Sequence, residues 1–167
     1  MDLEIRPVRR DDAAGLAELL NEVIARGGTT ALEDPFTPDA LDRTYLTGPD
    51  VLCCFVAVDP ASGRHAGFQT LGRDPALPPD VGDIATFARL GATQRGVGSA
   101  LFAATKAEAR RLGLAAINAT IRADNAGGLT FYGRMGFADH SVRAGVPLKE
   151  GTLVDRVNRR YDLRRGP

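Results

Sequence analysis

The stretch Gln94-Arg95-Gly96-Val97-Gly98-Ser99 is the most informative sequence motif in the chain. It lies between a predicted strand around residues 82–90 and a predicted helix over residues 98–112. Small residues at such a junction let successive backbone N–H groups face an anion at the helix N-terminus. The helix dipole adds roughly 0.3–1 kcal/mol for a negative charge there. The stretch therefore predicts a phosphate-binding loop, although a tight turn without a ligand would also explain an isolated G-x-G.

Two other kinds of phosphate loop are excluded by the residues around the glycines. A P-loop needs Lys and then Ser or Thr after its last glycine, and Val97 and Gly98 stand in those places. A dinucleotide loop needs a third glycine, where this chain has Leu101, and an acid about 20 residues later, where it has Asn118. What remains is a loop that holds a diphosphate through its backbone.

A second motif follows about 30 residues downstream, in the sequence N-A-G-G-L-T-F-Y-G-R-M-G-F over residues 125–137. With this motif the chain resembles the GNAT acetyltransferase superfamily, which pairs a (Q/R)-x-x-G-x-(G/A) loop with an N-x-x-A-x-x-F-Y-x-x-x-G-F helix. The resemblance is specific over about residues 84–137. More weakly, residues 21–24 and 29–30 resemble the subgroup that acts on phosphinothricin and methionine sulfoximine. The loop departs from the pattern at its first position, which falls on Thr93.

The resemblance implies how an acyl-CoA donor is held. The backbone of the loop from Gln94 to Ser99 would cradle the pyrophosphate, and Asn125 would cap its helix or contact the pantetheine. Thr86, Phe87 and Ala88, in the preceding strand, would offer backbone groups to the acetyl carbonyl and the pantetheine. In the family a bulge in this strand aims an N–H at the carbonyl oxygen, an arrangement that stabilises an oxyanion.

Tyr132 is the predicted general acid. It lies seven residues after Asn125, about two helical turns, so both side chains share one face of the helix. A tyrosine has a reference pKa near 10 and a thiol near 8.5, so partial donation to the departing thiolate by a hydrogen bond is the expected mode. A core aromatic with an exposed hydroxyl is the alternative, whereas Phe131 and Phe137 are expected in the core.

Attack by a neutral amine also requires a group that takes up the ammonium proton. Glu33 is the first choice, because it lies in the loop between the first two helices, where the family binds acceptors. Asp83 and His65 are the other candidates. Cys53 and Cys54 are adjacent strand residues with no histidine or acid close in sequence, so they are expected to be inert.

The pattern of elements predicts the fold. A half-buried strand at residues 3–8 precedes a helix capped by Asp11 or Asp12. Two apolar segments at residues 51–58 and 64–71 flank a turn-rich connection and predict a hairpin. The full order is β-α-α-β-β-β-α-β-α-β-β. It indicates an α/β (α+β) fold with a mixed, mostly antiparallel central sheet of about seven strands flanked by helices.

Length and composition set further limits. The 167 residues suggest one domain, a single N-acetyltransferase domain over residues 1–167. Basic and acidic residues number 21 each, so the net charge of zero disfavours nucleic acid and acidic membranes as partners. No run approaches the roughly 20 apolar residues of a membrane span, and no cysteine spacing suggests a metal. Reduced cysteines and the acidic N-terminus favour a cytoplasmic location.

The sequence thus predicts an N-acetyltransferase that uses acetyl-CoA as co-substrate and needs no metal. Its expected acceptor is the primary amine of a small molecule, such as an amino acid or an analogue. Acetylation of an aminoglycoside, a polyamine or a protein N-terminus is an alternative within the same chemistry, as is a non-catalytic acyl-CoA-binding module. The resemblance also allows a homodimer.

Overall fold

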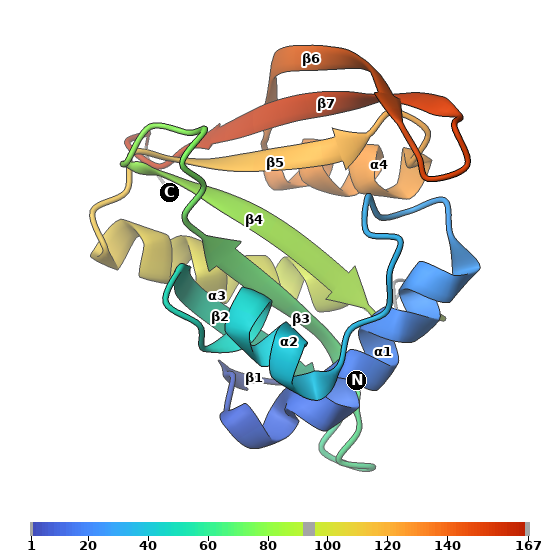
Figure 1. The fold of residues 1–167 in the computed structure, drawn as a ribbon. Coiled ribbons are helices and arrows are strands. Elements are labelled where there is room, and N and C mark those ends of the chain that lie inside the picture. The colour runs from blue at the N-terminus through green and yellow to red at the C-terminus, as the bar shows by residue number, and fades with distance from the viewer. Residues whose placement is uncertain (1, 92–95, 166–167) are drawn as a thin grey trace.

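A computed structural model describes residues 2–91 and 96–165 of the chain (Figure 1). The order of helices and strands is the one the sequence predicts. A short 3₁₀ turn (Arg10–Asp12) precedes the first helix, and a π-helical turn (Asp42–Leu46) follows the second. The elements are β1 (Glu4–Pro7), α1 (Ala13–Arg26), α2 (Pro38–Leu41), β2 (Val51–Val58), β3 (His65–Gly72), β4 (Val81–Ala88), α3 (Val97–Arg111), β5 (Ala116–Arg122), α4 (Ala126–Met135), β6 (Ala138–Pro147) and β7 (Leu153–Asp162).

The seven strands form one sheet in the order β1-β2-β3-β4-β5-β7-β6. All neighbours are antiparallel except β4 and β5, which are joined through α3 and run parallel. A parallel pair needs such a crossover because its second strand must start from the same end as the first. The predicted mixed, mostly antiparallel sheet is confirmed.

The β4–β5 pairing ends before either strand does. Its register runs from Val81↔Ala116 to Ile84↔Ala119, whereas β4 continues to Ala88 and β5 to Arg122. Figure 1 shows the two strands lying together at one end and separating toward their arrowheads. The sheet therefore opens between the carboxyl ends of two adjacent parallel strands, a usual place for a ligand in sheets of this kind.

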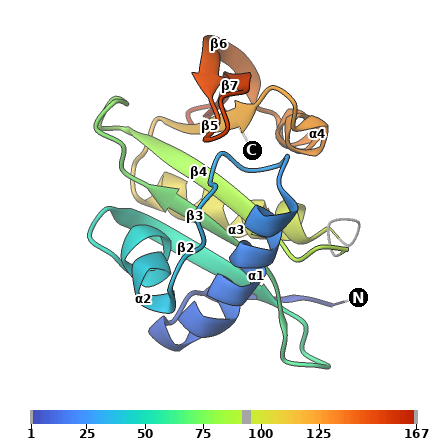
Figure 2. The ribbon, with the colours of Figure 1, turned by 45° about the vertical axis from the view of Figure 1, so that its right-hand side comes forward.

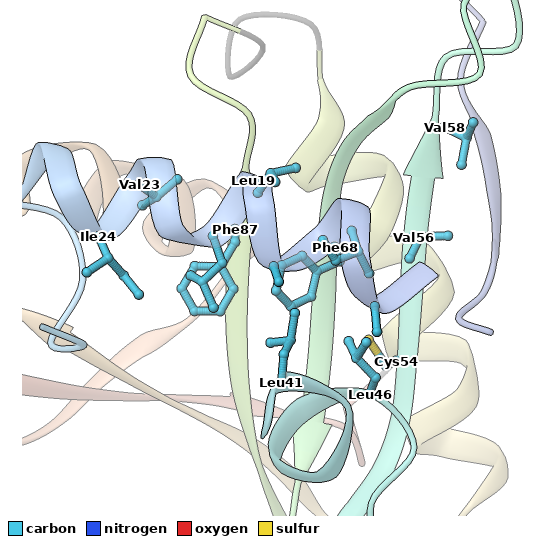
Figure 3. Packing of buried hydrophobic residues seen from close by; sticks show 14 residues of the cluster. Leu19, Val23, Ile24, Leu41, Leu46, Cys54, Val56, Val58, Phe68 and Phe87 are labelled. Carbon is cyan, nitrogen blue, oxygen red and sulfur yellow. The ribbon is translucent and has the colours of Figure 1, made fainter. Parts of the chain in front are cut away.

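Helices cover both faces of the sheet. Figure 2 shows α1 and α2 on one face and α3 on the other, and α4 contacts both α3 and β5. The apolar side of α1 packs with β2, β3 and β4 around Phe68 and Phe87, whose ring centroids lie 5.1 Å apart (Figure 3). A second cluster, around Phe102 and Phe137, fills the space between α3, α4 and the sheet. Among the described residues, no helix is long and apolar enough to cross a membrane.

Capping residues close in sequence determine where most of the helices begin and end. Thr37 caps α2 by accepting the N–H of Ala40 at 3.1 Å, and Gly136 ends α4 in the left-handed conformation. The predicted cap of α1 is only half right. Asp12 occupies the capping position, but its carboxylate turns back to the N–H of Arg9 at 2.7 Å and to the Arg6 guanidinium, with two bonds of 2.8 Å. This carboxylate joins β1 to α1 instead of capping the helix.

We expect Asp12→Asn to destabilise the fold by about 3 kcal/mol, because it removes a buried charge that pairs with Arg6 and lies 2.9 Å from His65 Nε2. These bonds hold the pKa of Asp12 well below its usual range, with burial opposing them. The ionised carboxylate therefore stabilises the fold above the unfolded pKa of about 3.9, and this stability is lost as pH falls. Thermal unfolding across pH, with the exposed Asp11→Asn as matched control, checks this. Equal melting temperatures for the two variants at neutral pH would contradict it.

Candidate active site

Tyr132 projects from α4 into the interior, next to the opening between β4 and β5. It is 8% exposed, and its ring packs edge to face on Phe131 and Phe137 at centroid distances of 4.9 and 5.0 Å. Its hydroxyl lies 2.9 Å from the hydroxyl of Thr86 on β4. Thr86 is the second residue after Ile84, where the β4–β5 pairing ends. The predicted acid and the predicted donor-binding strand therefore meet at the point where the sheet opens.

Burial sets the acidity of this phenol. It raises the pKa of Tyr132 to about 12, with a smaller contribution in the same direction from the Asp83 carboxylate, and the Thr86 hydrogen bond opposes the rise. Relative to a thiol of reference pKa near 8.5, complete proton transfer from this phenol is uphill by roughly 3–4 units. Tyr132 can instead donate a hydrogen bond to a sulfur that is gaining charge.

The direction in which each backbone N–H and C=O group of β4 points follows from its pairing with β3. The N–H of Arg89 donates to the carbonyl of Ala66, so by alternation the backbone groups of Phe87 also face β3. Those of Thr86 and Ala88 face the other way, toward the diverging β5. The β3–β4 register shows no shift from Gly67↔Ala88 to Gly72↔Asp83, so the bulge expected from the family is absent from this pair as described.

Of the three predicted donor-binding residues on β4, two thus present N–H groups to the opening. Phe87 is the exception, since its side chain is buried in the core beneath α1 and its backbone faces β3. The geometry favours Thr86 and Ala88 as the residues that contact a donor. The role predicted for Phe87 stays a prediction.

The glycine loop is described from Gly96 onward, and Thr93, Gln94 and Arg95 lie outside the described residues. Gly96 is the N-cap of α3 with φ of 72°, a left-handed conformation, and it has no side chain to bond the first free amides of the helix. Those amides belong to Val97, Gly98 and Ser99, and the Val97 side chain is anchored in the core. This terminus has the form of an anion site.

Gly98 has a second reason to be small. A Cβ at this position would lie 2.6 Å from the ring of Phe131, so α3 and α4 approach each other through the glycine. By contrast, a Cβ at Gly96 would meet no atom within 4 Å among the described residues beyond its chain neighbours. Gly96 is therefore required for its backbone conformation, and Gly98 is required because a side chain there would collide with Phe131.

Asn125 is the N-cap of α4, as one of its two predicted roles requires. Its Oδ1 accepts the N–H of Gly128 at 2.9 Å, and its Nδ2 donates to the carbonyl of Thr29 at 2.8 Å. The neighbouring Arg122, which forms an ion pair with Asp124, donates to the carbonyl of Thr30. The α1–α2 loop is thus fastened to the start of the helix that carries Tyr132. A contact of Asn125 with pantetheine stays a prediction.

Glu33, the predicted base, lies exposed in this same loop. Both carboxylate oxygens accept the backbone N–H of Lys149, in the β6–β7 connection, at 3.1 Å. The Lys149 ammonium pairs with the adjacent Asp34. In this arrangement Glu33 fastens the loop to the hairpin, and its catalytic role stays a prediction.

Asp83 has the environment that a base requires. It lies on β4, half-buried, and its Oδ1 accepts a hydrogen bond of 3.0 Å from Asn118 on β5. Burial raises the pKa of Asp83, and Asn118 opposes the rise. Asn118 in turn accepts from the Nε of Arg160 at 2.8 Å. Asn118 and Arg160 were not predicted from the sequence, although a polar residue within an otherwise apolar strand, as Asn118 is in β5, is a signal that could have indicated them.

The other sequence candidates have structural roles here. His65 lies against Asp12 at the far end of β3, and its ring fills the space beside Gly15. Burial raises the pKa of Cys53 to about 12 and raises that of Cys54 as well, so both thiols stay protonated at neutral pH. Within residues 2–91 and 96–165, no group of three or more His, Cys, Asp or Glu side chains is placed to hold a metal.

Solved structures with this fold cover nearly the whole chain. The N-acetyltransferase from Staphylococcus aureus Mu50 is 20% identical with a TM-score of 0.84, over 98% of this chain and 100% of the other. The ribosomal-protein-alanine N-acetyltransferase from Brucella melitensis is 19% identical with a TM-score of 0.82, over 96% and 99%. A GNAT superfamily phosphinothricin acetyltransferase from Sinorhizobium meliloti, in complex with acetyl-CoA, is 17% identical with a TM-score of 0.81, over 97% and 89%. At these identities the likeness concerns the fold.

The family is identified from the sequence. No curated protein matches the chain significantly. A model of the acetyltransferase (GNAT) family matches residues 17–137. This match contains the glycine loop, β4 and the helix with Tyr132, and it spans well over half of the sequence. The chain therefore belongs to the GNAT acetyltransferase family.

Proposed function

We propose that this protein transfers the acetyl group of acetyl-CoA to the primary amine of a small molecule, with Tyr132 as general acid. The observation that carries the proposal is the meeting of Tyr132 and Thr86 at 2.9 Å, at the opening between β4 and β5. A module that only bound acyl-CoA would not need a buried phenol at this point. The proposal takes residues 1–167 as one catalytic domain acting in the cytoplasm.

The donor fits the features of this opening. The free amides at the start of α3 would hold the pyrophosphate, and the N–H groups of Thr86 and Ala88 would bind the pantetheine and the acetyl carbonyl. An N–H that faces the carbonyl oxygen stabilises the negative charge that develops there. Gln94 and Arg95, the remaining loop residues of the proposal, would add contacts to the phosphates.

The reaction is a direct transfer. The amine nitrogen forms a bond to the acetyl carbon, the C–S bond breaks, and its electron pair stays on the sulfur. The ammonium releases one proton to solvent before the attack, and the base takes a second N–H proton when the nitrogen has bonded to the acetyl carbon. Tyr132 donates its hydrogen bond, and finally its proton, to the sulfur. Solvent returns a proton from the base to Tyr132, so the products are an N-acetyl amine and the free thiol of CoA.

Asp83 is the base that the geometry favours. It is close enough to Tyr132 to raise the pKa of the phenol, and its own pKa is raised by burial, so it accepts a proton more readily than an exposed carboxylate does. Glu33, by contrast, is exposed and both its oxygens already bind the Lys149 N–H. Both carboxylates remain in the proposal, with Asp83 preferred.

The acceptor is proposed to be an amino acid or an analogue. The guanidinium of Arg160 lies one hydrogen-bonded amide away from Asp83, through Asn118. An amine beside Asp83 could thus carry an acidic group that reaches Arg160. Arg89, which follows β4, donates to the carbonyl of His65 and pairs with Glu22, so Arg160 is preferred for this role. Other amines, such as aminoglycosides, polyamines or a protein N-terminus, are the alternative, and a homodimer is part of the proposal by analogy with the family.

Replacing the acid gives the first test. Tyr132→Phe should keep acetyl-CoA binding and lower turnover by roughly 10²–10⁴, because it removes only the donor to the leaving sulfur. Thiol release over a panel of amines measures turnover, and calorimetry measures binding. Tyr161→Phe, the same change elsewhere in the same aromatic cluster, should leave both nearly unchanged. Unchanged turnover in Tyr132→Phe would remove this residue from the mechanism.

The glycine loop is tested by Gly96→Val. A β-branched residue at φ of 72° is strained, so the start of α3 should distort and acetyl-CoA binding should be lost. Gly113→Val is the matched control, since Gly113 has φ of 77° and equally open surroundings near the other end of α3. Both variants should lose about 1–3 kcal/mol of stability. If both bind CoA equally well, the loop assignment is wrong.

The variants Asp83→Asn and Glu33→Gln distinguish the two candidate bases. Asp83→Asn should lower turnover by roughly 10²–10⁴, whereas Glu33→Gln should have a small effect. Because folding raises the pKa of Asp83, its contribution is most favourable below the unfolded pKa of about 3.9 and is lost as pH rises from there through the folded pKa. Asp83→Asn should therefore raise the melting temperature at neutral pH, with the gain shrinking as pH falls. The reverse ranking of the two variants in turnover would make Glu33 the base.

A further inference from the structure

Gln69 is a fully buried amide in the middle of β3, directly opposite Thr86 in the β3–β4 register. Its Nε2 donates a hydrogen bond of 2.9 Å to the hydroxyl oxygen of Thr86, and its Oε1 has no partner among the residues described. Buried amides are normally satisfied at both ends, because an unpaired polar atom is unfavourable. This amide is two hydrogen bonds away from the proposed acid, through Thr86, which suggests a role connected with the acid.

The position of the pair supports a direct role. Gln69 and Thr86 form a pair that exchanges no backbone hydrogen bonds, because the bonded pairs alternate with it and include Arg89 with Ala66. In such pairs the Cα atoms are about 4.5 Å apart and the side chains lie close. The two side chains therefore hold each other in register with little freedom, and Thr86 then contacts Tyr132 at 2.9 Å.

The direction of the first bond follows from which atoms can donate, whereas either hydroxyl can donate in the second. A threonine hydroxyl has one proton and two lone pairs, whereas Gln69 Nε2 can only donate. Gln69 uses one lone pair of the Thr86 oxygen, so the Thr86 proton and the second lone pair remain for Tyr132, whose hydroxyl can donate or accept across the 2.9 Å contact. The relay described below requires the arrangement in which Thr86 donates its proton to the Tyr132 oxygen. The phenol then accepts from Thr86, and its own proton is free to point away, into the opening between β4 and β5.

We propose that Gln69 and Thr86 are positioning residues, forming a relay that orients the hydroxyl of Tyr132 so that its proton faces the leaving sulfur. This inference rests on the proposed function, in which Tyr132 is the acid. When the proton passes to the sulfur, negative charge grows on the phenol oxygen, and the Thr86 O–H that points at it stabilises that charge. The backbone N–H of Thr86 faces the same opening, so one residue would serve both the carbonyl and the leaving group.

Side-chain variants of Thr86 test the relay without touching its backbone N–H. Thr86→Val keeps the shape and removes the hydroxyl, and it should lower the single-turnover rate of acetyl transfer about 10-fold at saturating acetyl-CoA, with the Kd for acetyl-CoA unchanged. Thr86→Ser restores the hydroxyl and should recover the rate. Gln69→Met, which keeps the length and removes the donor, should lower the rate several-fold.

A double-mutant cycle separates a relay from a general loss of structure. If Thr86 acts through Tyr132, Thr86→Val should lower the rate in the parent protein and have no effect in the Tyr132→Phe background. Thr70→Val is the matched control, because it removes another buried strand hydroxyl, one bonded to the carbonyl of Tyr45, on the other face of β3. An equal fall in both backgrounds, or no fall in the parent, would overturn the relay.

A spectroscopic readout keeps the relay testable if Tyr132 proves not to be the acid. The ultraviolet resonance Raman doublet of tyrosine reports whether a phenol donates or accepts a hydrogen bond, and the chain has three tyrosines and no tryptophan. The difference between parent and Tyr132→Phe assigns the signal of Tyr132. We expect an accepting phenol that changes in Thr86→Val and is restored in Thr86→Ser. An unchanged signal in Thr86→Val would overturn the relay, whereas unchanged turnover in Tyr132→Phe would overturn only the acid.

Discussion

The β4–β5 pairing stops after Ile84 and Ala119, although both strands continue for several more residues. Backbone groups beyond that point must find other partners, since an unpaired N–H is unfavourable away from water. On β4 this leaves the N–H groups of Thr86 and Ala88 facing an opening. Every proposed element of the site is arranged around it: the start of α3 on one side, Tyr132 from α4, and Asp83 just before it on the strand.

Structures of the same fold come from enzymes that are named for a ribosomal protein and for phosphinothricin. Acceptor choice therefore depends on side chains that vary on a common frame. In the function proposed above, those side chains are the polar residues on the strand face opposite Tyr132, where Asp83, Asn118 and Arg160 form one hydrogen-bonded group.

Most of the fold could be predicted from the sequence, because it depends on local signals. Apolar periodicity placed the helix of Leu16 to Ile24, and Thr37, Gly27 and Gly136 marked helix ends. For the candidate site, the sequence motif predicted the position of Tyr132 on α4, and its catalytic role stays a prediction. The separation of β4 from β5, the bond between Asn125 and Thr29 and the pairing of Gln69 with Thr86 depend on residues far apart in the chain. Asp12 shows the same limit, since its carboxylate has an available local role as a cap and bonds to Arg6 instead.

The hydrogen bonds that join the α1–α2 loop to the start of α4 limit how the substrate range can be changed. The amide of Asn125 holds the first turn of α4 with one end and the carbonyl of Thr29 with the other. A substitution that shifts the loop backbone at Thr29 would also disturb the start of the helix that carries Tyr132. If the proposed acceptor site is right, engineering toward new amines should leave residues 29 and 30 in place and vary the strand face around Arg160, which lies apart from this fastening of α4.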